Sequence, residues 1–258
     1  MKKRIYCLLI VLLILTTVII LWKSKINSTE DTTASTVTSV ESHTENSPVV
    51  CIDAGHGFGD PGCESNLLSG LEADVTLEIM KLLKNELQNV GITVILTHDG
   101  KTYPSCQQII SMANKNTIDY DEARLIENNV FSAYERVIYA SALNKGTPID
   151  LFVSIHINSI ENHPEVSRYE LYYYENNPYA SLLTEFCNSL SQKLDNDTEI
   201  FATKSDESYT VTRYTDFPSL LIECGYATNK ADADKLNSNV WRQKFCKTLA
   251  NEIILWIS

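Results

Sequence analysis

Three ionisable side chains in this sequence stand where short apolar segments end. His56, His156 and Glu223 each come at the end of such a segment, where a strand would give way to a loop. In open α/β sheets, ligands bind outside the carboxyl ends of the strands. If the three segments are strands of one sheet, two imidazoles and a carboxylate come within reach of one another. Such a group could bind a metal ion and move a proton.

The spacing of these residues leaves a second interpretation open. A single histidine after a strand is most often a hydrogen-bonded loop residue, and a glutamate there usually faces solvent. Asn158 lies on the same strand face as His156, so it could support a ligand or contact a substrate. We interpret His98 as a turn residue and His163 as a loop residue that could face a substrate groove. Spacing alone therefore does not decide whether a metal site exists.

The elements that must position these side chains alternate between strand and helix. Residues 49–52 form a short apolar strand that runs into a glycine-rich loop, and apolar residues at three- and four-residue spacing predict a helix over 71–90 that Gly91 ends. The remaining expected elements are strands over 92–96, 150–157, 169–174, 209–213 and 219–223, and helices over 131–143, 178–194 and 241–257. This alternation predicts an α/β fold with helices on both faces of a sheet.

Residues 99–130 interrupt this alternation. They show no clear period and are rich in Asn, Asp and Glu, so we interpret them as a long excursion with one short helix. The excursion could cover a substrate groove or dock a regulatory partner, and the sequence does not choose between these roles.

The first 23 residues differ from the rest of the chain. Residues 5–22 form an apolar run of 18 residues without a charge, which is long enough for a transmembrane helix. No clear small-residue cleavage site follows, so we expect residues 1–23 to be an uncleaved membrane anchor; the alternative is a signal peptide that releases the protein to the cell wall. The flanking basic residues narrowly favour a cytoplasmic N-terminus and an extracytoplasmic remainder.

Residues 24–47 are expected to be a flexible linker. Eleven of the twenty residues 28–47 are Ser or Thr, and such a segment cannot bury enough apolar surface to offset the entropy of ordering. As a random coil the linker would span about 27 Å. Residues 48–258 remain, and their 211 residues suffice for one domain with a large core.

Charge and cysteine content exclude some functions of that domain. Of the whole chain, 1–47 holds five basic and four acidic residues, which leaves 16 basic and 29 acidic residues and a net charge of −13 in 48–258. We therefore expect no nucleic-acid partner, because the domain would repel phosphates. The cysteines include no CxxC pair, so a zinc-thiolate site is not expected, and no disulfide pairing is predicted.

Four sequence blocks together carry a family resemblance. They read IDAGHG with DPG at 52–62, LEADVTL at 71–77, SIHINS at 154–159 and LIECGYATN at 221–229. These blocks resemble, in order, those of the zinc-dependent N-acetylmuramoyl-L-alanine amidases, the Amidase_3 family. The resemblance extends over essentially all of residues 48–258.

The resemblance implies a fold, an activity and a set of roles. The fold would be three-layered αβα with a mixed, mainly parallel central sheet. The activity would be hydrolysis of the amide between N-acetylmuramic acid and L-alanine, which would make peptidoglycan glycan and stem peptides the partners, in wall remodelling or autolysis. His56, Glu72 and His156 would hold Zn²⁺, and Glu223 would be the catalytic carboxylate.

These roles agree with general zinc chemistry. Two imidazoles and one carboxylate leave a fourth position of a tetrahedral zinc open, as catalytic sites require. A carboxylate beside the metal can take a proton from water and return it to the leaving nitrogen. Two other functions remain open: a catalytically silent wall-binding module, and a zinc peptidase that cuts between amino acids.

Overall fold

The computed structural model describes residues 47–126, 131–194, 198–203 and 209–258. The predicted membrane anchor and all but the last residue of the predicted linker lie outside these ranges, and both stay predictions. Within the described ranges, no helix combines the length and the apolar character needed to cross a membrane.

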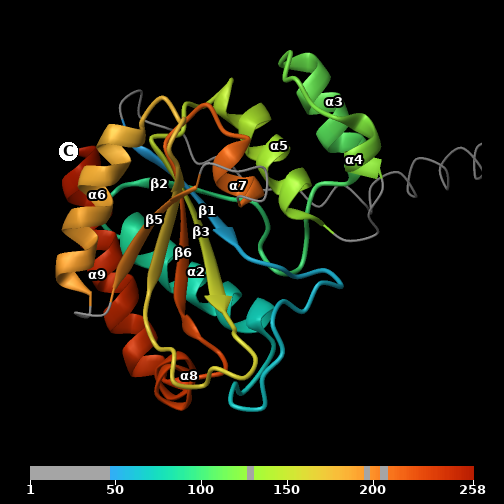
Figure 1. Ribbon diagram of the computed structural model, residues 1–258. Coiled ribbons are helices and arrows are strands. Elements are labelled where there is room, and N and C mark those ends of the chain that lie inside the picture. The colour runs from blue at the N-terminus through green and yellow to red at the C-terminus, as the bar shows by residue number, and fades with distance from the viewer. Residues whose placement is uncertain (1–46, 127–130, 195–197, 204–208) are drawn as a thin grey trace, which may run out of the picture. The chain divides into compact units, whose positions relative to one another are not determined.

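A mixed sheet of six strands forms the centre of the fold (Figure 1). The strands are β1 (Val49–Ala54), β2 (Thr93–Leu96), β3 (Leu151–Asn158), β4 (Glu170–Tyr174), β5 (Glu199–Thr203) and β6 (Ser219–Tyr226). They lie in the order β2-β1-β3-β6-β4-β5, and every neighbouring pair is parallel except β4 and β6. The predicted mixed, mainly parallel sheet is therefore confirmed.

One face of the sheet is covered by three long helices, α2 (Glu72–Gln88), α6 (Ala180–Lys193) and α9 (Asn239–Ile257). Alternate strand residues such as Ile52, Val153 and Ile222 point to this face and pack in one cluster with Ile79 and Leu83 of α2. Strands that are buried on both faces carry nearly continuous apolar runs, which explains why the sequence pattern of β1, β3 and β6 is so uniform.

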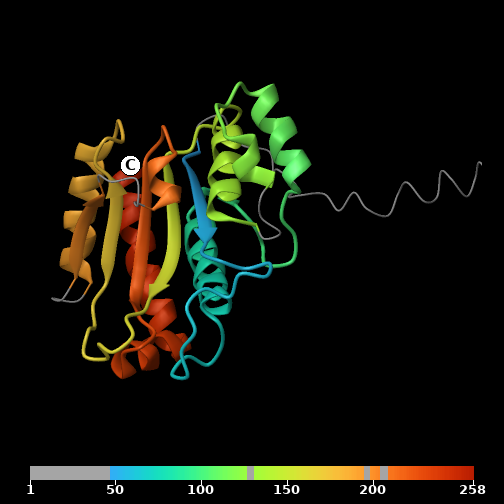
Figure 2. The same ribbon diagram turned by 45° about the vertical axis from the view of Figure 1, so that its right-hand side comes forward.

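The opposite face carries α5 (Ala133–Asn144) and α7 (Thr210–Arg213). Cys51, Phe152 and Leu221 point to this face and cluster with Ala140 of α5 and Val211 of α7. Seen from the second direction, the sheet lies between its helical layers, which confirms the three-layer expectation (Figure 2).

The described part of the excursion, residues 99–126, holds two helices, α3 (Cys106–Lys115) and α4 (Glu122–Ile126), where one was expected. Ile109 and Leu125 of these helices pack against Val137 and Ile138 of α5. The excursion thus adds a small hydrophobic cluster on the side of α5. Its docking of a partner stays a prediction.

The expected strand over 209–213 is wrong, because this segment forms the short helix α7. Its aromatic and β-branched residues favour a strand, but strand preference depends strongly on the packing around it. Here Val211 is buried against the α5 face, and the Thr212 hydroxyl donates to the carbonyl of Tyr209. The sheet position next to β4 is taken by β5, which was not predicted. The helix α8 (Lys230–Asn237) was also not predicted.

Candidate active site

His56 lies in a tight loop that leaves the carboxyl end of β1. The amide of Gly55 donates to the carbonyl of Ile155 at 2.8 Å, so the loop starts against β3. His56 has a φ of 66°, and its Nδ1 donates to Asp60 Oδ2 at 2.8 Å. A carboxylate on one ring nitrogen fixes the orientation of the ring and leaves the other nitrogen for a metal. The carboxylates of Glu72 and Asp60 raise the pKa of His56 above its ordinary value, against the effect of burial.

Glu72 is the first residue of α2 and is almost completely buried. Its Oε1 accepts a hydrogen bond from the amide of Ile157 at 2.9 Å, and its Oε2 accepts one from the amide of Cys63 at 2.7 Å. Burial would raise the pKa of Glu72, but His156 and His56 outweigh it and hold this pKa well below its usual range. The carboxylate is therefore charged and held from two sides by backbone groups.

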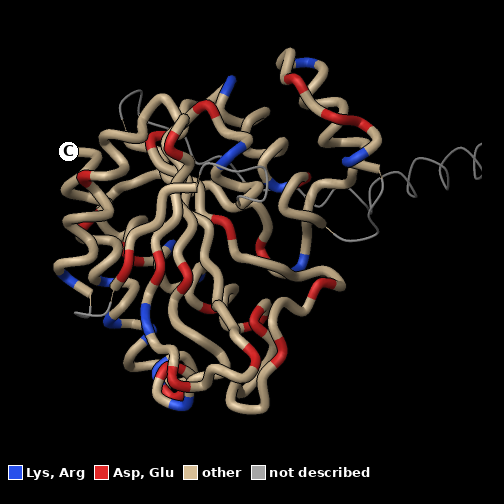
Figure 3. Tube along the Cα trace, viewed as in Figure 1, with Lys and Arg blue, Asp and Glu red and all other residues tan. Residues whose placement is uncertain are grey.

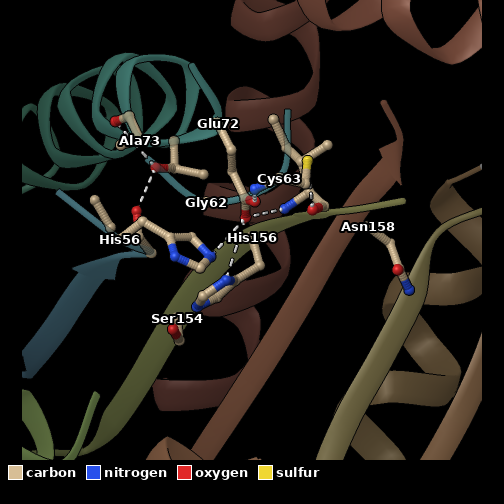
Figure 4. A network of polar contacts seen from close by, with 12 residues as sticks. His56, Gly62, Cys63, Glu72, Ala73, Ser154, His156 and Asn158 are labelled. Atoms are coloured by element: carbon tan, nitrogen blue, oxygen red, sulfur yellow. Dashed lines mark hydrogen bonds and ion pairs between the residues drawn. The ribbon is translucent and has the colours of Figure 1, made fainter. Parts of the chain in front are cut away.

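The two histidines converge on this carboxylate (Figure 4). His56 Nε2 lies 3.2 Å and His156 Nδ1 lies 3.3 Å from Glu72 Oε1. One ligand atom from each of the three residues lies within 4.8 Å of the others. Two nitrogens and one oxygen are a donor set that suits zinc. The structure thus brings together the three predicted ligands, and the residues fit the metal that the resemblance implies.

Two glycines make room for this arrangement. A Cβ atom on Gly55 would lie 2.4 Å from Cε1 of His156. A Cβ atom on Gly62, which has a φ of 75°, would lie 2.5 Å from Glu72 Oε2 and 2.8 Å from His56 Cδ2. Any larger residue at either position would collide with the converging side chains.

Glu223 lies beside His156, because the two residues are register partners on the parallel strands β6 and β3. Its side chain is 5% exposed, and its Oε2 has no hydrogen-bond partner among the described residues. Burial and the charges of Glu72 and Glu170 raise the pKa of Glu223 to about 8. A carboxyl group with a pKa near neutrality can both accept and donate a proton.

An ion pair behind the loop was not predicted from the sequence. Asp53 is completely buried, and its Oδ1 accepts a hydrogen bond from Arg136 Nε at 2.8 Å. The hydroxyls of Thr97 and Ser154 donate to the same carboxylate at 2.6 and 2.7 Å. This network joins β1, β3 and α5 directly behind the His56 loop. An aspartate at the end of an apolar strand was the signal that could have revealed it.

A second unpredicted carboxylate lies on the other side of Glu223. Glu170 of β4 is the antiparallel register partner of Glu223 and is 2% exposed. Four side chains donate to it: Asn158, Arg168, Tyr172 and Tyr226. Its pKa stays below the ordinary value despite burial, because these donors stabilise the charge. Asn158 donates one of these hydrogen bonds to Glu170, and the role in supporting a ligand or contacting substrate that the sequence suggested for it stays a prediction.

Two further histidines of the described ranges, His98 and His163, lie apart from the converging group. His98 is buried, and its Nε2 donates to the carbonyl of Ala54 at 2.9 Å. His163 is largely exposed and pairs with Glu165 at 3.0 Å. The positions of the acidic and basic residues along the described chain are shown in Figure 3.

Comparison with known proteins agrees with this site. The chain is 30% identical over 207 residues to the uncharacterised protein YqiI of Bacillus subtilis, with 79% of this chain and 82% of that protein covered. It is 26% identical over 213 residues to the probable cell wall amidase LytH of Staphylococcus aureus, covering 81% of this chain but only 58% of LytH. The structure resembles the N-acetylmuramoyl-L-alanine amidase AmiC2 of Nostoc punctiforme, with a TM-score of 0.58, 28% identity, and coverage of 81% and 96% of the two chains.

The sequence profile of one family matches most of the domain. It covers residues 50–121 and 124–254, which include His56, Glu72, His156 and Glu223. The chain therefore belongs to the Amidase_3 family of N-acetylmuramoyl-L-alanine amidases.

Proposed function

We propose that this protein hydrolyses the amide bond between N-acetylmuramic acid and L-alanine in peptidoglycan, with His56, Glu72 and His156 as zinc ligands and Glu223 as the proton carrier. The convergence of both histidines on Glu72 Oε1, with Glu223 in register beside His156, carries this proposal. Membership of the amidase family supports the assignment of this amide as the bond that is hydrolysed.

Zinc bound by these three side chains would leave a position open, lower the pKa of a water molecule there and polarise the scissile carbonyl. The remaining features of the site hold its ligands in place. Asp60 holds the ring of His56, and the amides of Cys63 and Ile157 hold the carboxylate of Glu72. Such support from neighbouring groups keeps ligand geometry close to what catalysis needs.

Glu223 supplies the proton transfers of the reaction. Its carboxylate accepts a proton from the attacking water, and the resulting carboxylic acid donates that proton to the amide nitrogen as the bond to the carbonyl carbon breaks. An amine leaves far more readily when it is protonated, so one residue serves both steps. The Oε2 atom of Glu223, which has no partner among the described residues, is available for this exchange.

The place where the protein acts follows from its predicted N-terminal segments. As an uncleaved anchor with an external domain, residues 1–23 would tie the enzyme to the cell membrane. The linker over 24–47 would then restrict it to wall material close to the membrane.

The proposal is tested with the full-length chain, purified in detergent and supplied with zinc. The protein is incubated with peptidoglycan, and the released fragments are identified by mass spectrometry. Free stem peptides that begin with L-alanine are expected, together with muramic acid residues that carry a free lactyl carboxylate.

Two results would contradict the proposal. New termini inside the stem peptide would identify a peptidase. Binding to peptidoglycan without any cleavage would identify a silent wall-binding module. A Lys145→Ala variant serves as the control, because Lys145 is exposed and pairs with the exposed Asp216.

A further inference from the structure

Glu170 binds several polar side chains close to the proposed proton carrier Glu223. It is the register partner of Glu223, and partners in an antiparallel pair have Cα atoms about 5 Å apart. Its carboxylate is buried and receives hydrogen bonds from four side chains, of which only Arg168 is cationic. Any side chain that is hydrogen-bonded to Glu170 therefore lies close to Glu223.

Carboxylates hold the Arg168 side chain through the Nε atom of its guanidinium group. Nε donates to Glu170 Oε1 at 2.8 Å and lies 3.3 Å from Glu199 Oε2, and the group lies 5.8 Å from the centre of the Tyr226 ring. The side chain is 31% exposed. The guanidinium also shares a hydrogen bond with the Tyr226 hydroxyl, and its ion pairs with described residues are both made by Nε, not by its two terminal nitrogens. An arginine held in this way presents a pair of N–H groups that matches a carboxylate.

The position of Arg168 suits a contact near the scissile bond. It precedes Glu170 by two residues, and β4 runs antiparallel to β6, so Arg168 lies toward the edge where β6 ends. Two residues of chain span at most about 7 Å, and the backbones of Glu170 and Glu223 lie about 5 Å apart, so the backbone of Arg168 lies within about 12 Å of that of Glu223. A group two residues along an extended peptide lies about 7 Å from the scissile bond. Arg168 thus lies near enough to Glu223 to meet a group on that part of the peptide.

The negative charge of the surroundings favours a cation as the partner of an acidic ligand. Glu72, Glu170 and Glu223 all lie at this edge, and the domain has a net charge of −13. The nearby guanidinium of Arg136 is buried and bound to Asp53. Zinc held by His56, Glu72 and His156 would offset part of this negative charge, and Arg168 would supply the cation for a peptide carboxylate that lies beyond the zinc.

We propose that Arg168 determines substrate specificity by binding the α-carboxylate of the second stem-peptide residue, D-glutamate, whose peptide bond runs through its γ-carboxyl group. This inference rests on the proposed amidase function. It assigns Arg168 to substrate binding and Glu170 to positioning, since Glu170 acts through the arginine that it holds.

The test uses two disaccharide tetrapeptides that are identical except at one group. The α-carboxyl group of the D-glutamate is free in one and amidated in the other. Steady-state cleavage by the full-length wild type is compared with Arg168→Ala, Arg168→Lys and the control Arg124→Ala. Arg124 also stacks on tyrosine rings but belongs to α4 in the excursion.

Wild type should cleave the free-acid substrate with about ten- to a hundred-fold higher kcat/KM than the amidated one, the range expected for hydrogen bonds to a charged group. Arg168→Ala should lose this preference through a higher KM on the acid substrate, with little change on the amide. Arg168→Lys should restore part of the preference, and Arg124→Ala should behave as wild type.

Wild-type enzyme that cleaves both substrates equally would overturn the inference without any variant. So would an Arg168→Ala variant that keeps the preference, or one that loses activity equally on both substrates while retaining its zinc content and Tm. Should wild type release no stem peptide from either substrate or from polymeric peptidoglycan, the amidase function itself would fail, which is a distinguishable result.

Discussion

His156 and Glu223 are register partners on the neighbouring parallel strands β3 and β6. A proposed metal ligand and the proposed proton carrier therefore project from the same face of the sheet, with backbones about 4.8 Å apart. Ladder hydrogen bonds on both sides hold this spacing, since β3 also pairs with β1, and β6 with β4. His156 and Glu223 therefore cannot move apart without breaking hydrogen bonds at the centre of the sheet.

Replacing Glu223 by glutamine should separate metal binding from turnover. The amide has nearly the same shape but cannot accept the proton from water, so kcat should fall by about a hundred-fold or more. Zinc content, measured by elemental analysis of the purified protein, should equal that of wild type because Glu223 is not one of the converging ligands. Near-normal turnover in this variant would refute the assigned role.

Replacing His56 by alanine should abolish zinc binding together with activity. Wild type should gain about 2.7 kcal/mol of unfolding free energy when zinc is added at a hundred times its Kd. His56→Ala should show no such gain at the same zinc concentration, whereas His163→Ala should show all of it. Thermal unfolding with zinc and with a chelator measures the difference. An equal gain in both variants would exclude His56 as a ligand.

Alanine at Gly62 should damage the site by collision. The added Cβ would lie 2.5 Å from Glu72 Oε2. Gly91→Ala is a matched control, because Gly91 has a similar positive φ of 86° but no atom within 4 Å of the added Cβ. Both variants should lose about 1–2 kcal/mol from backbone strain. Only Gly62→Ala should also lose zinc affinity, as measured by titration, and equal affinities in the two variants would contradict the role given to Gly62.

Asparagine at Asp53 should destabilise the fold at neutral pH by about 3–5 kcal/mol, because it leaves the buried guanidinium of Arg136 without its counter-ion. The surface pair of Lys145 and Asp216 offers a control, since Lys145→Ala should cost less than about 1 kcal/mol. Urea unfolding measures both.

The same variant predicts a pH dependence. Burial raises the pKa of Asp53, but Arg136 and the two hydroxyl donors outweigh it, so the folded-state pKa lies below the ordinary value. The carboxylate therefore stabilises the fold above the ordinary aspartate pKa of about 4, and this stabilisation is lost as the pH falls through the lowered pKa. The difference in unfolding free energy between wild type and Asp53→Asn should shrink between pH 7 and pH 3. A constant difference would show that the charge of Asp53 does not stabilise the fold.

Local patterns in the sequence were enough to predict many elements of the domain. Helix α2 and strands β1, β3 and β6 follow from apolar spacing that a short window contains. Their places at strand ends made His56, His156 and Glu223 candidates, and the family resemblance gave them their roles. Glu72 came from the family resemblance, because nothing in its local pattern distinguishes it from other carboxylates on the same helix.

Only the tertiary structure decided which groups meet and how. Which strands pair, and in which register, depends on contacts between residues far apart in the chain, and a short sequence window does not contain them. That pairing brings His56 Nε2 and His156 Nδ1 to one oxygen of Glu72, and it sets Glu170 opposite Glu223. It also explains the segment 209–213, whose residues favour a strand but whose buried packing against α5 makes it a helix. Local residue preference is weak, and burial against distant partners outweighs it.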